Sequence, residues 1–246
     1  MMKRLLCGCA ALLMVWLTSP AKAELYSSIY DVYFGGLRVG EADVDLTLTE
    51  ADYKINIALR ARGLADVFTD FQAQADMQGK ITNNRLVPEK QHIVWSDGEE
   101  TKFSTLIYAE GKPVSYETNS DWVNDRDVVI PLTLEDVGFG SLDPISSMFA
   151  AVSASPCIVE QTLFDGLRMS KISPLVGEKS DPLACRLQWA PLAGHSRKST
   201  EHAKTMSPLK VAYTQVTDGF LAPHKVLVET RYGFIAMLMR TNYAKK

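Results

Sequence analysis

The chain has 246 residues, of which 46% are hydrophobic and 22% charged, and its formal net charge is -3. This balance is that of an average globular protein, and it excludes a disordered chain, a collagen and a protein with many membrane spans. The mildly acidic charge also argues against a general nucleic-acid binder, which needs a strongly basic domain.

Residues 1–23 have the three parts of a secretory signal peptide. Lys3 and Arg4 precede an apolar run from Leu5 to Leu17, and Ala21-Lys22-Ala23 supplies the small residues of a cleavage site. The run is shorter than the ~20 residues of a membrane-spanning helix. We therefore expect export and cleavage after Ala23. The alternative is a lipid anchor at Cys9, because the residues around it weakly match a lipoprotein processing box.

Cleavage there removes Cys7 and Cys9, so that only Cys157 and Cys185 remain in the mature chain. An exported compartment is oxidising, and a disulfide between the two is the expected state. The alternative is a pair of reduced, buried cysteines. Neither cysteine has the basic or helix-N-terminal setting that lowers a thiol pKa, so we expect a structural role for the bond.

Strand signals dominate the mature chain. In one of them, Ala42, Val44, Leu46 and Leu48 alternate with polar residues, which predicts a strand with one buried and one solvated face. Similar patterns predict strands at residues 30–34, 41–49, 53–60, 71–81, 87–95, 101–108, 114–117, 162–173, 184–190, 209–216, 225–231 and 234–241. The last is apolar on both faces, which predicts cover on both sides for part of it.

From residue 119 to about residue 155 the strand pattern is replaced by a polar stretch that ends in a predicted helix. Asp143 and Pro144 give a helix start signal, and Ile145, Met148, Phe149 and Val152 recur at helical spacing. We expect this short helix to lie against the sheet. The polar stretch 195–207 reads as an exposed loop, and its basic residues Arg197, Lys198 and Lys204 suit either a phosphate or anionic headgroup, or water alone.

These elements predict an all-β, mainly antiparallel fold for a single domain at residues 24–246. About ten short strands with one short packed helix indicate a highly curved sheet or an open β-barrel, because long flat sheets must curl to hide their apolar faces. The interior of such a sheet is either filled by side chains or open as an apolar groove. Alternation does not distinguish these two forms.

Motifs for catalysis, phosphate binding and dinucleotide binding are absent from the sequence, which predicts a protein without a cofactor and without enzymatic activity. The four histidines, His92, His195, His202 and His224, are scattered and have no metal-ligand spacing. The run Asp121, Asp125 and Asp127 lacks the glycine and glutamate of a calcium loop, so we expect no metal site there either.

Asp165, Gly166 and Arg168 form a candidate ligand or turn site. Aspartate followed by glycine suits a turn, because the carboxylate accepts backbone N–H bonds and glycine adopts positive φ. The alternative is that Asp165 and Arg168 act together as a functional pair.

Several segments together resemble the DUF3108 family, a domain of unknown function in exported proteins of Gram-negative bacteria. They are residues 30–33, 35–40, 143–148, 163–168, 185–187 and 190–194, with Pro156 and Cys157 between them. Leu167, Met169 and Ser170 depart from the family pattern, which is richer in arginine and tyrosine there. The resemblance implies a periplasmic β-rich domain that is distantly similar to the curved sheets that carry lipoproteins.

The leading hypothesis is a non-enzymatic periplasmic protein whose curved sheet offers an apolar groove to a lipid, an acyl chain or a lipoprotein. It follows from the export signal, the one-face-apolar strands and the lack of a catalytic constellation. The alternative is a closed β-scaffold that binds an envelope protein or a cell-wall component through its loops. In both hypotheses the protein binds no nucleic acid and is not itself an integral membrane protein.

Overall fold

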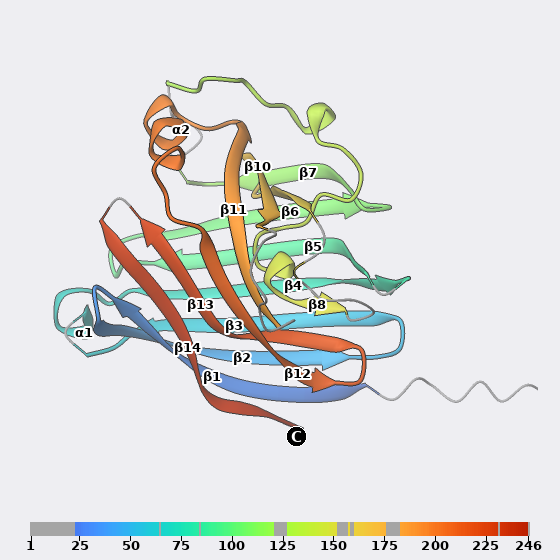
Figure 1. The fold of residues 1–246 in the computed structure, drawn as a ribbon, viewed down its shortest axis with the longest axis vertical. Helices are drawn as coiled ribbons and strands as arrows, with labels where there is room; N and C mark the ends of the chain where they lie inside the picture. Colours follow the sequence, from blue (N-terminus) through green and yellow to red (C-terminus); the bar gives the residue numbers. More distant parts are fainter. Residues whose placement is uncertain are drawn as a thin grey trace, which may run out of the picture.

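The computed structural model describes residues 23–63, 65–83, 85–120, 127–151, 157, 160–175, 183–230 and 232–245. Strands make up most of it (Figure 1). The first half contains β1 (Glu24–Phe34), β2 (Leu37–Leu48), β3 (Asp52–Ala61), β4 (Gln72–Thr82), β5 (Arg85–Ser96), β6 (Thr101–Ala109) and β7 (Lys112–Thr118). The second contains β8 (Ala150–Ala151), β9 (Gln161–Phe164), β10 (Met169–Pro174), β11 (Ala184–Ala193), β12 (Leu209–Thr217), β13 (Phe220–Thr230) and β14 (Gly233–Lys245).

All these strands belong to one antiparallel sheet. Its order is β7-β6-β5-β4-β3-β2-β1-β14-β13-β12-β11-β10-β9, and β8 pairs with β13 beside this path. The outermost strands β7 and β9 are not neighbours in this order, so the sheet is open and not a closed barrel. The prediction of an all-β, highly curved antiparallel sheet is confirmed.

The first and last strands lie side by side in the middle of the sheet. β1 pairs with β14 from Tyr26 opposite Lys245 to Phe34 opposite Ile235. Figure 1 shows the consequence: the strands of the first half run across the view, and those of the second half cross in front of them at a steep angle. The two halves therefore face each other.

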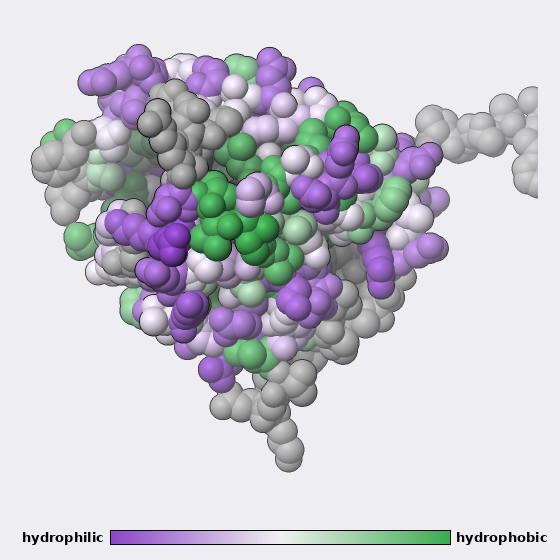
Figure 2. All heavy atoms as spheres, turned by 90° about the horizontal axis from the view of Figure 1, so that it is seen from above, coloured by the Kyte–Doolittle hydropathy of each residue, from purple (hydrophilic) through white to green (hydrophobic). Residues whose placement is uncertain are grey.

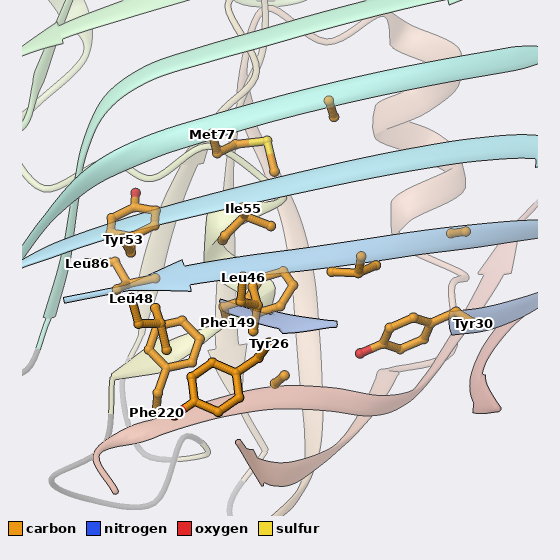
Figure 3. Close-up of a cluster of buried hydrophobic side chains, with 14 residues drawn as sticks. Tyr26, Tyr30, Leu46, Leu48, Tyr53, Ile55, Met77, Leu86, Phe149 and Phe220 are labelled. Atoms are coloured by element: carbon orange, nitrogen blue, oxygen red, sulfur yellow. The ribbon is translucent and has the colours of Figure 1, made fainter. Parts of the chain in front are cut away.

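The space between the halves is filled by side chains. Leu46, Ile55 and Met77 from the first half are buried in one cluster with Phe149 and Phe220 from the second (Figure 3). Because this interior is packed, described side chains occupy the space between β1–β5 and the strands that cross them, where the groove was expected.

Charged side chains join four adjacent strands on the opposite face. Glu41 of β2 accepts bonds from Arg60 of β3 and Arg240 of β14, and Arg38 bonds both Glu41 and Asp31 of β1. Arg60 first, and then Arg240, lower the pKa of Glu41 to about 2. The carboxylates of Asp31 and Glu41 stand directly opposite each other in the ladder, and the arginines offset their repulsion.

The prediction of a helix after Asp143 is wrong beyond the first turn. Asp143 does act as the cap, since its Oδ1 accepts the backbone N–H groups of Ile145 and Ser146. One 3-10 turn, Ser146–Met148, follows, and Phe149 is already extended. The chain leaves the helix because Ala150 and Ala151 form β8 and pair with β13, while Phe149 packs on Phe220. Val152 lies outside the described residues.

Two other expectations need correction. The stretch 195–207 is not an exposed loop, because it contains the helix α2 (Arg197–Ala203) and His195 is buried. The predicted strand 162–173 is divided by a turn into β9 and β10. In the last strand, residues 236–239 are half-buried on both faces, and the start at Phe234 and Ile235 is exposed. A second short helix, α1 (Ala65–Phe68), and a 3-10 turn, Leu134–Asp136, were also not predicted.

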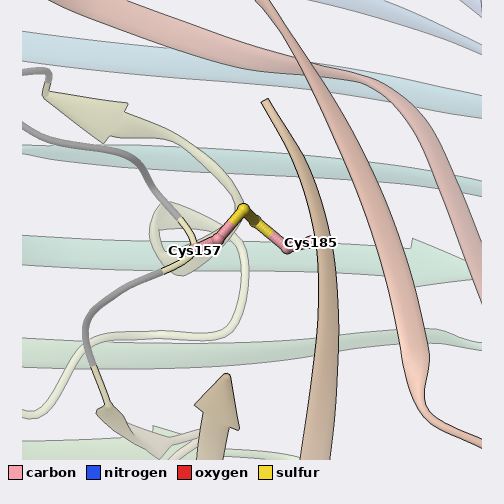
Figure 4. Close-up of a disulfide and its surroundings, with 2 residues drawn as sticks. All are labelled: Cys157 and Cys185. Atoms are coloured by element: carbon pink, nitrogen blue, oxygen red, sulfur yellow. A yellow bond between two sulfur atoms is a disulfide. The ribbon is translucent and has the colours of Figure 1, made fainter. Parts of the chain in front are cut away.

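Cys157 and Cys185 form a disulfide, as the sequence predicts (Figure 4). Their Cα atoms are 5.1 Å apart, and the bond joins positions 28 residues apart in the chain. Cys185 is the second residue of β11 and lies in the core cluster of the second half. The bond thus fastens the segment after β8 to the sheet.

Replacing Phe149 by alanine should lower the free energy of unfolding by about 3–5 kcal/mol, because the ring is buried between the two halves. Chemical denaturation followed by far-UV circular dichroism measures this loss. Phe139→Ala is the matched control, since Phe139 is exposed and should cost little. Equal losses in the two variants would show that Phe149 does not hold the halves together.

Candidate functional site

A pocket of about 580 Å³ opens beside α2, on the strands of the second half. Its apolar lining comes from the side chains Trp189, Met206, Leu209, Val228 and Tyr232. Its polar lining includes Arg168, Lys198, His202 and Glu229, with several serines between them. The volume is in the range of pockets that hold small molecules and lipids, roughly 300–1,000 Å³.

The floor of the pocket is a continuation of the protein core. Leu209, Val228 and Trp189 each lie two residues from a buried core residue, namely Val211, Val226 and Leu187. Residues two apart on a strand share a face. The inner face of β11, β12 and β13 therefore stays apolar beyond the end of the packed core and becomes open to solvent there.

The helix α2 forms one wall of the pocket. Ser196 caps it, because its Oγ accepts the N–H of Ser199 at 3.3 Å. Lys198 and His202 are four residues apart, so they lie on one face of the helix, and both line the pocket. The buried Nε2 of His202 has no hydrogen-bond partner within the described residues.

The pocket is therefore amphipathic. Arg168 and Lys198 carry positive charge at its lining, and the carboxylate of Glu229 accepts the backbone N–H of Ser207. Figure 2, which looks onto the end of the molecule that carries α2, shows apolar side chains gathered near the middle and hydrophilic ones around them. This arrangement suits a molecule with an apolar body and an anionic end.

The candidate site predicted from the sequence divides into two parts. Asp165 makes a turn, because its Oδ1 accepts the N–H groups of Leu167 and Arg168 at 2.9 and 2.7 Å. Gly166 has φ +99° and faces the ring of Tyr116, which a side chain at this position would overlap. Arg168 instead lines the pocket. The turn thus positions Arg168, and a ligand role for Asp165 stays a prediction.

Next to the pocket, Ser170 and His195 resemble a catalytic pair, but their hydrogen bonds have the wrong direction. His195 Nε2 lies 2.9 Å from Ser170 Oγ and 3.1 Å from the carbonyl oxygen of Met169. A carbonyl only accepts, so Nε2 carries the proton and does not take one from the serine. Burial lowers the pKa of His195, which keeps the ring neutral at pH 7. Its Nδ1 has no partner among the described residues that would orient it as a base.

A second buried polar cluster surrounds Asp143. Besides its two backbone bonds, Oδ1 accepts from Gln91, while Oδ2 has no partner in the described part of the chain. Complete burial raises the pKa of this carboxyl. The hydroxyl of Tyr53 bonds Ser146 beside it. None of these residues lines the pocket, and their bonds shape the chain after residue 143.

Metal ligands do not converge in the described residues, where no group of three or more His, Cys, Asp and Glu side chains is close enough to hold an ion. Asp121 and Asp125 of the acidic run lie outside them. No helix within the described ranges is long and apolar enough to cross a membrane.

A family model matches residues 29–178, which is more than half of the chain, and its description is a protein of unknown function, DUF3108. The chain belongs to the DUF3108 family. The match covers β1 from Ile29 onward, β2–β10 and the turn that contains Asp165 and Arg168, while most of the pocket floor and α2 lie beyond it. No curated protein and no solved structure matches the chain.

Signals for the pocket were present in the sequence but not decisive. The basic residues of stretch 195–207 were noticed, and Lys198 does line the pocket. Trp189, Leu209 and Val228 look like ordinary core positions of their strands. Only the arrangement of β11–β13 beside α2 shows that they are left uncovered.

Ionisation of Asp143 should make the protein less stable as pH rises. The folded-state pKa is raised, so the folded chain holds a proton that the unfolded chain releases near pH ~4. Stability should therefore fall from about pH 4 upward until the raised pKa is passed. Asp143→Asn keeps the Oδ1 cap and should flatten this part of the curve, measured by denaturation at a series of pH values.

Asp143→Ala is the control for the cap. It loses the two backbone bonds of Oδ1 and, like Asp143→Asn, no longer titrates, so it should be about 1–2 kcal/mol less stable than Asp143→Asn at every pH in this range. If the Asp143→Asn curve keeps the slope of the wild type, a different group causes the pH dependence.

Proposed function

We infer that this DUF3108 protein is an exported, non-enzymatic protein of the periplasm that binds an acyl chain, as a free lipid or as part of a lipoprotein, in the pocket beside α2. The observation that carries this proposal is the apolar floor formed by Trp189, Leu209 and Val228 with Arg168 and Lys198 at its polar lining. An acyl chain would cover apolar surface that water now contacts, and each buried CH₂ contributes ~0.8 kcal/mol.

The position of the pocket replaces the groove expected inside the curved sheet. The interior between the two halves is packed, which taken alone favours the alternative of a filled scaffold that binds through its loops. The pocket favours the binding of a small amphiphile, because its apolar floor continues the core face of the strands. The proton on His195 Nε2 counts against hydrolysis of such a ligand by Ser170.

The mature protein should bind a fluorescent fatty acid such as dansyl-undecanoic acid, with energy transfer from Trp189 to the dansyl group. Val228→Asp places a carboxylate on the floor and should weaken binding by about tenfold or more, because a charge next to the acyl chain must lose its water. Val228→Phe fills the pocket with an apolar ring and should weaken binding without adding charge. Fluorescence titration measures both.

Val114→Asp is the matched control, because Val114 is exposed on β7 and is not among the residues that line the pocket. It should bind the probe as the wild type does. A wild-type protein that binds no fatty acid, and that carries no lipid in native mass spectrometry after gentle purification, contradicts the proposal.

Export is a separate part of the proposal and has its own test. The protein recovered from the periplasm should begin at Glu24, and Cys157 and Cys185 should resist thiol labelling unless a reductant is added. N-terminal sequencing and peptide mapping give both results. Retention of Met1, or a lipid on Cys9, would show that the signal has been misread.

A further inference from the structure

An apolar row crosses six strands and leads from the core, through the pocket floor, to one end of the sheet. Strand pairing places Leu187 opposite Leu209, Val228 opposite Ile235, Ile235 opposite Phe34, and Phe34 opposite Leu37. Lys210 pairs with Leu227, so Leu209 lies opposite Val228 in the same ladder. Directly opposed residues share a face. The row consists of Leu187, Leu209, Val228, Ile235, Phe34 and Leu37.

Exposure increases along this row. Leu187 is buried, Leu209 and Val228 are half-buried in the pocket, and Leu37 at the far end is 58% exposed. The row therefore runs from buried residues to residues that contact solvent, and all of its members are apolar. An acyl chain that leaves the pocket along this row stays on apolar surface.

The exposed end of the row lies on two neighbouring turns. One joins β1 to β2 and the other joins β13 to β14, and the backbone N–H of Gly35 donates to the carbonyl of Phe234 at 3.0 Å between them. Both turns lie at the same end of the molecule in Figure 1, at its left. We call the side chains Phe34, Leu37, Tyr232, Phe234 and Ile235 the apolar tip; all five are exposed. Tyr232 belongs both to the tip and to the pocket lining.

Basic side chains lie near the tip, and two of them are paired with carboxylates: Arg197 with Asp127, and Arg38 with Asp31 and Glu41. The helix α2 and its C-cap residue carry Arg197, Lys198 and Lys204 against one acidic residue, Glu201. Arg38 follows Leu37 directly in β2, and its side chain is 35% exposed even while it bonds Asp31 and Glu41. Cations beside apolar and aromatic side chains are the composition of a surface that enters the headgroup region of an anionic bilayer.

The size of the tip fits a bilayer better than a folded partner. A standard protein interface uses roughly 20–30 residues on each side, whereas the tip has five side chains on two turns. Narrow turns with apolar ends insert among lipid headgroups without needing a complementary surface. A phenol such as that of Tyr232 is suited to this boundary, because its ring is apolar and its hydroxyl is polar.

We propose that the apolar tip docks this protein on the surface of an anionic lipid bilayer, with the mouth of the pocket beside the lipids. The proposal extends the proposed function, because the docked tip places the apolar row between the bilayer and the pocket. It stands on the exposure and position of the tip, and its test does not require that the pocket be filled.

Flotation with vesicles tests the docking. The protein from residue 24 to residue 246 should float with phosphatidylcholine vesicles that contain phosphatidylglycerol, and less with phosphatidylcholine alone. Leu37→Ser and Phe234→Ser remove exposed apolar side chains, so the fold should not change. Each should lower the partition coefficient by about tenfold, because burial of one such side chain in an apolar medium is worth about this factor.

Phe139→Ser is the matched control for Phe234→Ser. Phe139 is 75% exposed, more than the 59% of Phe234, and it lies outside both the tip and the pocket lining. It should leave flotation unchanged. Equal losses in the two variants, or a wild type that does not float with anionic vesicles, would overturn the proposal. So would a dimer in sedimentation velocity that Leu37→Ser dissociates, since the tip would then be a contact between two copies.

Fatty-acid titration in solution separates this proposal from the previous one. Leu37→Ser lies at the far end of the row from the pocket and should bind the soluble probe as the wild type does. If the protein does not dock on vesicles but binds the probe normally, only the membrane proposal is overturned. Docking without any probe binding overturns only the pocket proposal.

Discussion

The pairing of β1 with β14 is the interaction on which the rest of the structure depends. It joins residues more than 200 positions apart, such as Ser28 and Thr241, and turns two separate meanders into one sheet. Without it each half would expose the apolar face that the other half covers. The cost is entropic, because the ends of a long chain must meet before any of these contacts form.

Both faces of this central pair are stabilised, by different means. On the inner face the hydroxyl of Tyr30 donates to the carbonyl of Pro223 at 2.6 Å and lies 3.1 Å from that of Tyr243. On the outer face Glu41 gathers arginines from three strands. Exposed ion pairs contribute little singly, but Glu41 is largely buried and its partners form one network. Contacts on the inner face and on the outer face thus both fix the register of β1 against β14.

Sequence alone was sufficient for the local part of this fold. Alternation in Ala42, Val44 and Leu46 depends only on neighbours in the chain, and these residues are buried in β2 as expected. The helix α2 was missed because Ala203 is its only buried residue, so it has no apolar stripe. Phe149 was placed in a helix because its spacing was helical, but pairing of the next residues with β13 prevailed over that local preference.

The pocket depends on contacts between distant parts of the chain, and for this reason it could not be predicted from the sequence. Its floor residues have the same alternation as the core, and whether they are covered depends on how far the opposing half extends. Over this part of β11–β13 the cover is α2, seven residues long, which is too short to be stable alone and buries little apolar surface itself. Packing is thus concentrated where the two halves cross, around Phe149 and Phe220, and is incomplete at the pocket. A ligand that binds there adds cover to the fold and does not have to displace any of its core.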